Sequence, residues 1–329
     1  MQTRKVGPFD VSAIGLGCMS LSHAYGLPPE AAASERLLNA ALDMGVTFLD
    51  TAALYGFGAN EELVGRSLKH RRSEYVLASK CGMFRNEAGV REINGRPDVL
   101  KRTCDDSLRR LQTDVIDLYY LHRWDKKVPI EESVGALSEL VAVGKVKAIG
   151  LSEVSAVTLR KAHAVHPVAA VQTEYSLWTR NPEVAVLDAC RELGAALVAF
   201  SPVARGFLSG KLTDVSDLPP KDIRLGMPRF QGENFAANLA LLDGFGAIAE
   251  DVGCTMAQLA LAWLLHKDPI IVPIPGTTRV DHFEEDLGAL GVSLSPAVMG
   301  RLEDLINPST VAGPRYNAAT QTEIDTEEL

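Results

Sequence analysis

The chain has 329 residues, of which 47% are hydrophobic and 23% are charged, the composition of a globular protein with a large buried core. Lys and Arg total 33 against 42 for Asp and Glu, which gives a formal net charge of -9. No basic tract is dense enough to neutralise a row of phosphates, so we expect neither nucleic acid nor an anionic membrane surface as a partner.

The sequence also lacks signals for membrane insertion, for secretion and for disulfide bonds. No apolar run reaches the roughly 18 to 20 residues of a membrane span, and residues 1–10 lack the basic and apolar regions of a signal peptide. We therefore expect a cytoplasmic protein. The five cysteines are widely spaced and form no C-x-x-C pair, which favours reduced thiols over disulfides or a zinc site.

In chain order, the sequence alternates between two kinds of segment. Residues 1–10, with Gly7 and Pro8 between two short β-rich pieces, favour a hairpin. Eight apolar β-rich runs follow, at 12–17, 46–50, 75–80, 116–122, 146–152, 168–172, 196–201 and 269–274. Helical periodicity lies between them, at 30–44, 60–70, 98–111, 130–143, 155–165, 182–193, 236–252 with 255–267, and 280–290. Eight βα units close a TIM barrel, so we predict one α/β, (β/α)8 domain over residues 1–329, plugged by the hairpin.

Residues that are common at helix ends support these boundaries. Gly45, Gly144 and Gly194 come just after expected helices and just before expected strands, where a left-handed residue ends a helix at little cost. We expect Asn181 to cap the next helix, with Pro182 at its first position. Two long segments, 212–234 and 307–329, do not fit the βα rhythm, and we expect them to be loops at the C-terminal face of the barrel.

Active sites of such barrels lie where the strands end, at their C-terminal edge. The last residues of seven of the runs are polar or small: Gly17, Asp50, Lys80, His122, Ser152, Gln172 and Ser201. A purely structural rim would not need an Asp, a Lys and a His on successive strands. Tyr55, five residues after Asp50, completes a candidate catalytic quartet.

The ionisation of these four side chains suggests a reaction. An ammonium group near a tyrosine lowers the pKa of its hydroxyl, and Lys80 can supply that charge to Tyr55. Asp50 would hold Lys80 in place, while His122 would hydrogen-bond a substrate oxygen or the Tyr55 hydroxyl. These four side chains suit a reaction in which a carbonyl oxygen becomes an alkoxide. No nucleophile or metal cage accompanies it, which indicates an external hydride from a nicotinamide cofactor.

Several ordered motifs resemble the aldo-keto reductases. They are Leu49-Asp50-Thr-Ala-Ala-Leu-Tyr55-Gly56, Ser79-Lys80, Leu121-His122-Arg123, Ile149-Gly-Leu-Ser152, Val171-Gln172, Phe200-Ser201-Pro202, and Ile274-Pro-Gly276-Thr277-Thr278-Arg279. The resemblance covers nearly the whole chain. The stretches from Ser176 to Arg180 and from Pro228 to Gln231 are most similar to aryl-alcohol dehydrogenase and pyridoxal reductase-like members, which act on aryl aldehydes, ketones or pyridoxal.

The resemblance implies a role for each matching position. Tyr55 corresponds to the general acid, Lys80 and Asp50 to the pair that tunes it, and His122 to the group that orients substrate. NADPH (or NADP+) is the implied cofactor, since a guanidinium beside a hydroxyl suits a 2′-phosphate. The implied cofactor contacts are Gly17, Cys18, Met19, Asp50, Ser152, Glu153, Gln172, Phe200, Ser201, Pro202, Arg205, Gly206, Gly276, Thr277, Arg279, Glu285 and Asp286.

Some of these positions depart from the commoner family pattern. Glu153 stands where Asn is usual, so its carboxylate would accept the carboxamide N–H or point away. Phe200 keeps a stacking face without a tyrosine hydroxyl, and Asp286 replaces a frequent Asn. Four aromatic residues just past strand ends are candidates to line a pocket for a small carbonyl substrate: Tyr25, Phe84, Trp124 and Trp178.

Two rival functions stay open at this point. One is a barrel that binds NADPH as a redox-sensing or auxiliary subunit with vestigial catalysis, for which loss of a quartet member would be the signal. The other is a barrel isomerase or metal-dependent hydrolase without nicotinamide, which would need a carboxylate or histidine cage at the rim. No metal site is expected. The natural substrate, the physiological direction and the oligomeric state do not follow from the residues.

Overall fold

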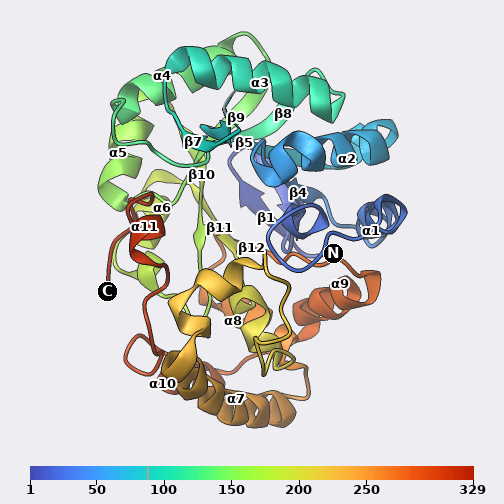
Figure 1. Ribbon diagram of the computed structural model, residues 1–329, viewed down its shortest axis with the longest axis vertical. Helices are drawn as coiled ribbons and strands as arrows, with labels where there is room; N and C mark the ends of the chain where they lie inside the picture. The colour runs from blue at the N-terminus through green and yellow to red at the C-terminus, as the bar shows by residue number, and fades with distance from the viewer. Residues whose placement is uncertain (87–88) are drawn as a thin grey trace.

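A parallel sheet rolled into a barrel forms the centre of the computed structural model, which describes residues 1–86 and 89–329 (Figure 1). The strands, in spatial order, are β12 (Ile271–Ile274), β11 (Ala196–Phe200), β10 (Val168–Glu174), β9 (Val146–Ser152), β8 (Ile116–Leu121), β5 (Val76–Cys81), β4 (Phe48–Asp50) and β3 (Leu16–Gly17). The backbone N–H groups of Gly15 and Gly17 donate to the carbonyls of Pro273 and Pro275, each at 3.0 Å. These bonds join the two edge strands and close the predicted (β/α)8 barrel.

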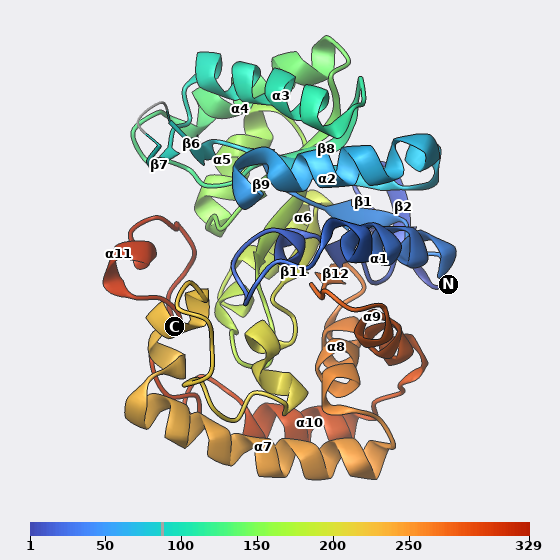
Figure 2. The same ribbon diagram turned by 45° about the vertical axis from the view of Figure 1, so that its right-hand side comes forward.

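Helices cover the outside of the barrel, as Figures 1 and 2 show. They are α1 (Ala31–Asp43), α2 (Ala59–Leu68), α3 (Pro97–Leu111), α4 (Ile130–Ala142), α5 (Ala156–Val165), α6 (Val186–Leu193), α7 (Gly232–Val252), α8 (Met256–Lys267), α9 (Val280–Leu287), α10 (Pro296–Leu305) and the short α11 (Ala318–Gln321). Helix α3 illustrates the reason: Leu100, Cys104, Leu108 and Leu111 recur on one face and are buried.

The ends of the helices follow local chemistry. Gly45, Gly144 and Gly194 adopt positive φ angles of 87°, 78° and 70° at the predicted turns. The prediction for Asn181 was wrong. Asn181 begins a short 3-10 helix (Asn181–Glu183), and α6 starts only at Val186, because the chain bends between the two.

The interior of the barrel is apolar and is plugged at its N-terminal end. Phe48, Leu118, Tyr120 and Val198 belong to one buried cluster inside the strands. The predicted hairpin, β1 (Thr3–Val6) with β2 (Phe9–Ser12), adds the fully buried Val6 and Val11 to that cluster. The hairpin therefore extends the hydrophobic core and confirms the predicted plug.

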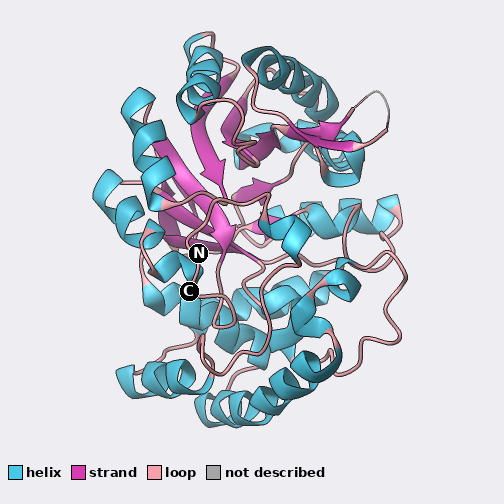
Figure 3. Cartoon of the chain, turned by 60° about the vertical axis from the view of Figure 1, so that its left-hand side comes forward, coloured by secondary structure: helices cyan, strands magenta, loops and turns pink. Residues whose placement is uncertain are grey.

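Three features of the fold were not predicted. A small hairpin of β6 (Met83–Arg85) and β7 (Arg91–Ile93) follows β5 and stands apart from the barrel strands in Figure 3. Helix α10 lies beside α7, and the C-terminal segment runs back across the barrel to α5. Among the described residues no single helix is long and apolar enough to cross a membrane; α7 and α8 pass together by length and composition but meet at 79°.

Candidate active site

The four residues of the predicted quartet meet at the C-terminal edge of the barrel. Asp50 ends β4, Lys80 lies near the end of β5, His122 follows β8, and Tyr55 opens a short 3-10 helix (Tyr55–Gly58). The Lys80 ammonium pairs with Asp50 and donates hydrogen bonds to the Thr51 carbonyl, at 2.8 Å, and to the Tyr55 hydroxyl, at 3.2 Å. The Tyr55 and His122 rings lie edge to face, with centroids 5.8 Å apart.

The loop that carries Tyr55 is held by buried polar side chains of α2. Asn60 accepts a hydrogen bond from the Thr51 hydroxyl at 2.6 Å and donates one to the Cys18 carbonyl at 2.8 Å. Glu61, fully buried, accepts from Ser79 at 2.6 Å and pairs with Arg110 at 2.7 Å. No role was predicted for Asn60 and Glu61 from the sequence, although polar residues on the buried face of a helix were the available signal.

Burial governs the protonation of these groups. Burial raises the pKa of Tyr55 above its ordinary value, and the charge of Lys80 offsets this only in part. Lys80 therefore acts on the pKa of Tyr55 in the expected direction, but burial outweighs it and the net pKa is raised. Burial would lower the pKa of Lys80, but Asp50 and Tyr55 outweigh it and raise the pKa. Burial, with the positive charge of Arg123, places the pKa of His122 well below its ordinary value. At neutral pH the site thus holds a protonated tyrosine, a charged lysine and a neutral histidine.

A cavity of about 1240 Å³ extends from this quartet across the barrel mouth. Tyr55, His122 and Tyr25 lie along it. It is also lined by most of the predicted cofactor contacts: Gly17, Met19, Asp50, Ser152, Gln172, Phe200, Ser201, Pro202, Arg205, Gly206, Gly276, Thr277, Glu285 and Asp286. Lys80 is absent from its lining because Lys80 lies beneath Tyr55, 1% exposed.

Three predicted cofactor contacts lie elsewhere. Cys18 is fully buried in the hydrophobic core. Arg279 caps the start of α9 and extends into solvent, where it pairs with Asp281 at 2.5 Å. The Glu153 carboxylate points away from the cavity, because the Thr173 hydroxyl and the Glu174 N–H donate to it at 2.9 Å and the Arg315 guanidinium pairs with it.

Three of the four aromatic residues proposed for the substrate pocket do not line the cavity. Trp178 is 3% exposed and stacks on Phe207 with ring centroids 4.3 Å apart, so it belongs to the core. Trp124 turns its indole N–H to the Val128 carbonyl at 2.8 Å. Phe84 lies on the β6–β7 hairpin, pairing with Glu92. Tyr25 is the member of the set that borders the cavity.

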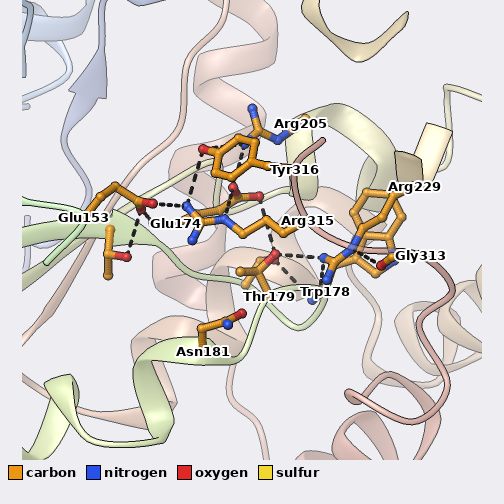
Figure 4. Close-up of polar contacts among 12 residues, drawn as sticks. Glu153, Glu174, Trp178, Thr179, Asn181, Arg205, Arg229, Gly313, Arg315 and Tyr316 are labelled. Carbon is orange, nitrogen blue, oxygen red and sulfur yellow. Dashed lines mark hydrogen bonds and ion pairs between the residues drawn. The ribbon is translucent and has the colours of Figure 1, made fainter. Parts of the chain in front are cut away.

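A buried ionic cluster lies behind the cavity (Figure 4). Glu174, at the end of β10, accepts from Arg205 at 2.5 Å and from Arg315 of the C-terminal segment at 2.8 Å. The Tyr316 hydroxyl accepts from Arg205 at 3.2 Å. The two arginines lower the pKa of Glu174 to about 2 against the opposing effect of burial. Arg205 is thus fixed by a carboxylate, and its guanidinium is partly neutralised.

The backbone after β11 suits a phosphate-bearing cofactor. Ser201, Ala204 and Arg205 have positive φ angles of 50°, 49° and 59°, and Gly206 follows at 89°. Non-glycine residues are rarely left-handed and gather at functional sites, where turns of backbone N–H groups can form anion-binding concavities. A Cβ on Gly276 would lie 3.0 Å from the Ser20 hydroxyl oxygen and 3.1 Å from the Gly17 carbonyl oxygen, so a side chain at this position would require these neighbours to shift. The residues present therefore fit a dinucleotide laid along the cavity.

Two parts of the cavity wall were missed by sequence reasoning. Arg123 and Arg91 border the cavity near the quartet. In addition, the 212–234 loop crosses to the loop after β3, because the Ile223 N–H donates to the Ala24 carbonyl at 3.0 Å and Asp222 accepts from the Gly26 N–H at 3.0 Å. Contacts between loops so distant in sequence leave no signal in either segment.

Comparison with known proteins gives a consistent result. The model of the aldo/keto reductase family matches residues 13–307. The chain is 46% identical to the aldo-keto reductase yakc (NADP(+)) of Schizosaccharomyces pombe over 95% of this chain and 94% of that protein. It is 43% identical to the probable aldo-keto reductase 1 of Glycine max, over 94% and 89%. Among solved structures, the glycerol dehydrogenase of Gluconobacter oxydans superposes with a TM-score of 0.85 at 29% identity, covering 96% of this chain and 99% of that one. The chain therefore belongs to the aldo/keto reductase family.

Proposed function

We propose that this chain reduces the carbonyl group of a small aldehyde or ketone to an alcohol, with NADPH as the reductant. The observation that carries the proposal is the Tyr55 hydroxyl, which accepts a hydrogen bond from the buried Lys80–Asp50 pair and lies beside His122 in the large cavity. A neutral phenol held by an ammonium is a proton donor at the place where charge develops on a carbonyl oxygen.

Each residue of the quartet has a distinct task in this reaction. Tyr55 donates its proton to the carbonyl oxygen. Lys80 then stabilises the phenolate that remains, and Asp50 keeps Lys80 charged and in place, with the Gln172 amide donating to Asp50 at 2.7 Å. His122, neutral at its lowered pKa, hydrogen-bonds the substrate oxygen and orients it toward Tyr55.

The residues along the cavity would hold the cofactor. Bound NADPH supplies the hydride. Ser152 and Gln172 would hold the carboxamide, Phe200 the nicotinamide face, and the loop 201–206 the pyrophosphate. Thr277, Glu285 and Asp286 lie at the far end of the cavity, where the adenosine phosphate would bind. The name of the relative from Schizosaccharomyces pombe supports NADP(H) over NAD(H).

For the substrate, we propose a chemical class and not a single compound. We propose aryl or pyridoxal-type aldehydes as first candidates, on the resemblance of residues 176–180 and 228–231. Tyr25 gives the cavity an aromatic side chain on its wall, which suits a flat substrate.

The test combines cofactor binding with turnover. Purified protein is titrated with NADPH and NADH, and oxidation of each is followed with aryl, aliphatic and pyridoxal-type aldehydes. The proposal expects tighter NADPH binding and NADPH-dependent reduction of at least one aldehyde. Tight NADPH binding with no turnover of any aldehyde would instead support a cofactor-sensing or auxiliary subunit.

A further inference from the structure

Arg123 lies in the candidate active site without an assigned task. It follows His122 directly in sequence, is half-buried, and borders the same cavity as Tyr55. One nitrogen, Nη1, donates to the His122 carbonyl at 2.7 Å and to the Ser152 hydroxyl at 3.1 Å. These two bonds fix the guanidinium at the floor of the cavity, next to the reacting groups.

The charge of Arg123 differs from that of the other arginines along the cavity. Those three each pair with a carboxylate: Arg91 with Glu323, Arg205 with Glu174, and Arg224 with Asp222. Within residues 1–86 and 89–329, Arg123 bonds only to the His122 carbonyl and the Ser152 hydroxyl, neither of which is a carboxylate. Its field nevertheless reaches the quartet, since it lowers the pKa of His122, after the larger effect of burial.

The remaining donors of Arg123 are available to a ligand. A guanidinium carries five N–H groups in a rigid plane, and within the described residues only Nη1 of Arg123 makes a hydrogen bond. Such a fork matches the two oxygens of a carboxylate, and a half-buried guanidinium without an ionic partner gains from a charged one. The other three arginines along the cavity are already paired with carboxylates.

We propose that Arg123 determines substrate specificity by pairing with a carboxylate on the substrate, so that the preferred substrates are aldehyde or keto acids. This inference rests on the proposed function, because the same substrate presents its carbonyl to Tyr55 and His122. Arg123 is not assigned any part in proton transfer. Its loss should therefore lower the turnover of carboxylate-bearing substrates far more than the turnover of neutral carbonyls.

The kinetic test uses two aldehydes of similar shape, 4-carboxybenzaldehyde and methyl 4-formylbenzoate, at saturating NADPH. The variants are Arg123→Gln, Arg123→Lys and, as a control for net charge, Arg109→Gln on the exposed face of α3, where the side chain is 73% exposed. We expect wild type to prefer the carboxylate by about 10- to 100-fold in kcat/KM, mainly through KM, the range of one charge-assisted hydrogen-bonded pair. Arg123→Gln should abolish this preference, with kcat/KM for the acid falling much more than kcat/KM for the ester. Arg123→Lys should keep part of it, and Arg109→Gln all of it.

A binding measurement without turnover accompanies the kinetics. Benzoate and benzamide are titrated calorimetrically into the protein loaded with NADP+. Wild type should bind benzoate more tightly, and Arg123→Gln should bind the two alike. Equal handling of acid and ester by wild type, or a benzoate preference that survives in Arg123→Gln, would overturn the inference. If neither aldehyde turns over, the proposed function fails, and the benzoate titration still decides the role of Arg123.

Discussion

Lys80 is 1% exposed, yet it stays charged because Asp50 pairs with it. The pair has the opposite charges and the hydrogen bonds that a buried ammonium requires. The charge of Lys80 also affects Tyr55. Burial raises the pKa of Tyr55, and without Lys80 the pKa would be raised further. The consequence is a tyrosine that remains protonated until well above neutral pH.

The pH profile of reduction follows from the upward shift in the pKa of Tyr55. Carbonyl reduction needs the protonated phenol, and the pKa of Tyr55 is raised above its ordinary value of 10.0. With NADPH saturating, kcat should therefore stay flat from about pH 6 to 9 and fall only as the pH rises through the pKa of Tyr55, beyond about pH 10. Steady-state rates across this range provide the check. A decline with its midpoint near pH 7 would contradict the assigned proton donor.

Asp286 offers a test through stability. Burial, with the nearby Glu285 carboxylate, raises the pKa of Asp286 to about 7. The folded protein therefore holds this proton while the unfolded chain has lost it, so stability falls as the pH rises toward 7. Asp286→Asn removes the ionisable carboxyl group, and with it this loss of stability at higher pH. Its gain in the free energy of unfolding should be larger at pH 8.5 than at pH 5.5 by about 1–2 kcal/mol, measured by urea denaturation.

A pH-independent effect of Asp286→Asn would show that Asp286 ionises normally in the folded protein. The exposed Asp251→Asn on α7, whose side chain is 60% exposed, is a suitable control. Its effect should stay within about 0.5 kcal/mol at both pH values.

At this scale, sequence predicted the chemistry better than the orientation of single side chains. Asp50, Lys80 and His122 could be found because each closes a β-rich run. For Glu153 the choice between accepting the carboxamide N–H and pointing away stayed open, because its partner Arg315 lies 162 residues further along the chain. The prediction that Trp178 lines the substrate pocket was wrong for a similar reason, since only tertiary packing brings Phe207 onto the face of its ring.

The C-terminal segment is the element that most alters the site. Arg315 enters the ionic cluster, and Asp325 bridges to Val154 and accepts from Thr158 at 2.6 Å. Glu327 accepts from the Ala156 N–H at 2.7 Å, at the positive end of α5. The polar composition of residues 307–329 indicated a loop, but the contacts make it part of the wall behind the cofactor cavity.

Loss of Arg315 should therefore be costly. Arg315→Met leaves Glu153 without its cation and Glu174 with only one, in a site where both carboxylates are almost fully buried. Breaking a buried pair by removing one partner costs about 3–5 kcal/mol, and we expect urea denaturation to report a loss of that size.

The matched control for that change is Arg301→Met on α10, whose exposed pair with Asp251 has a 2.8 Å separation. An exposed pair contributes about 0–1 kcal/mol, so this variant should be nearly neutral. Similar losses in the two variants would show that the cluster behind the cavity is not an energetic anchor.

For the whole molecule, closure of the barrel was predictable and its additions were not. Eight alternating units predicted the (β/α)8 barrel, and Gly7 with Pro8 predicted the hairpin that plugs it. The β6–β7 hairpin was missed because its strands have three residues each, too few to show a strand periodicity. Its neighbour in space, the C-terminal segment, contributes Glu323 to pair with Arg91, a contact that only the folded barrel brings about.

We propose that residues 1–329 unfold as one unit, because the hydrogen bonds from β3 to β12 leave no edge at which the barrel could separate. The three tryptophans, Trp124, Trp178 and Trp263, report on distant parts of the chain. Equilibrium urea transitions followed by tryptophan fluorescence and by far-ultraviolet circular dichroism should coincide. Two resolved transitions would indicate independent domains.

The measurement that tests the account most directly compares wild type with Tyr55→Phe. NADPH oxidation with an accepted aldehyde and NADPH affinity are measured for both proteins, with Tyr119→Phe on β8, outside the cavity, as the control. We predict that Tyr55→Phe lowers kcat by about 100- to 10,000-fold and leaves the Kd of NADPH within about 3-fold, while Tyr119→Phe retains activity. Near-normal turnover by Tyr55→Phe would contradict the assignment of Tyr55 as the proton donor.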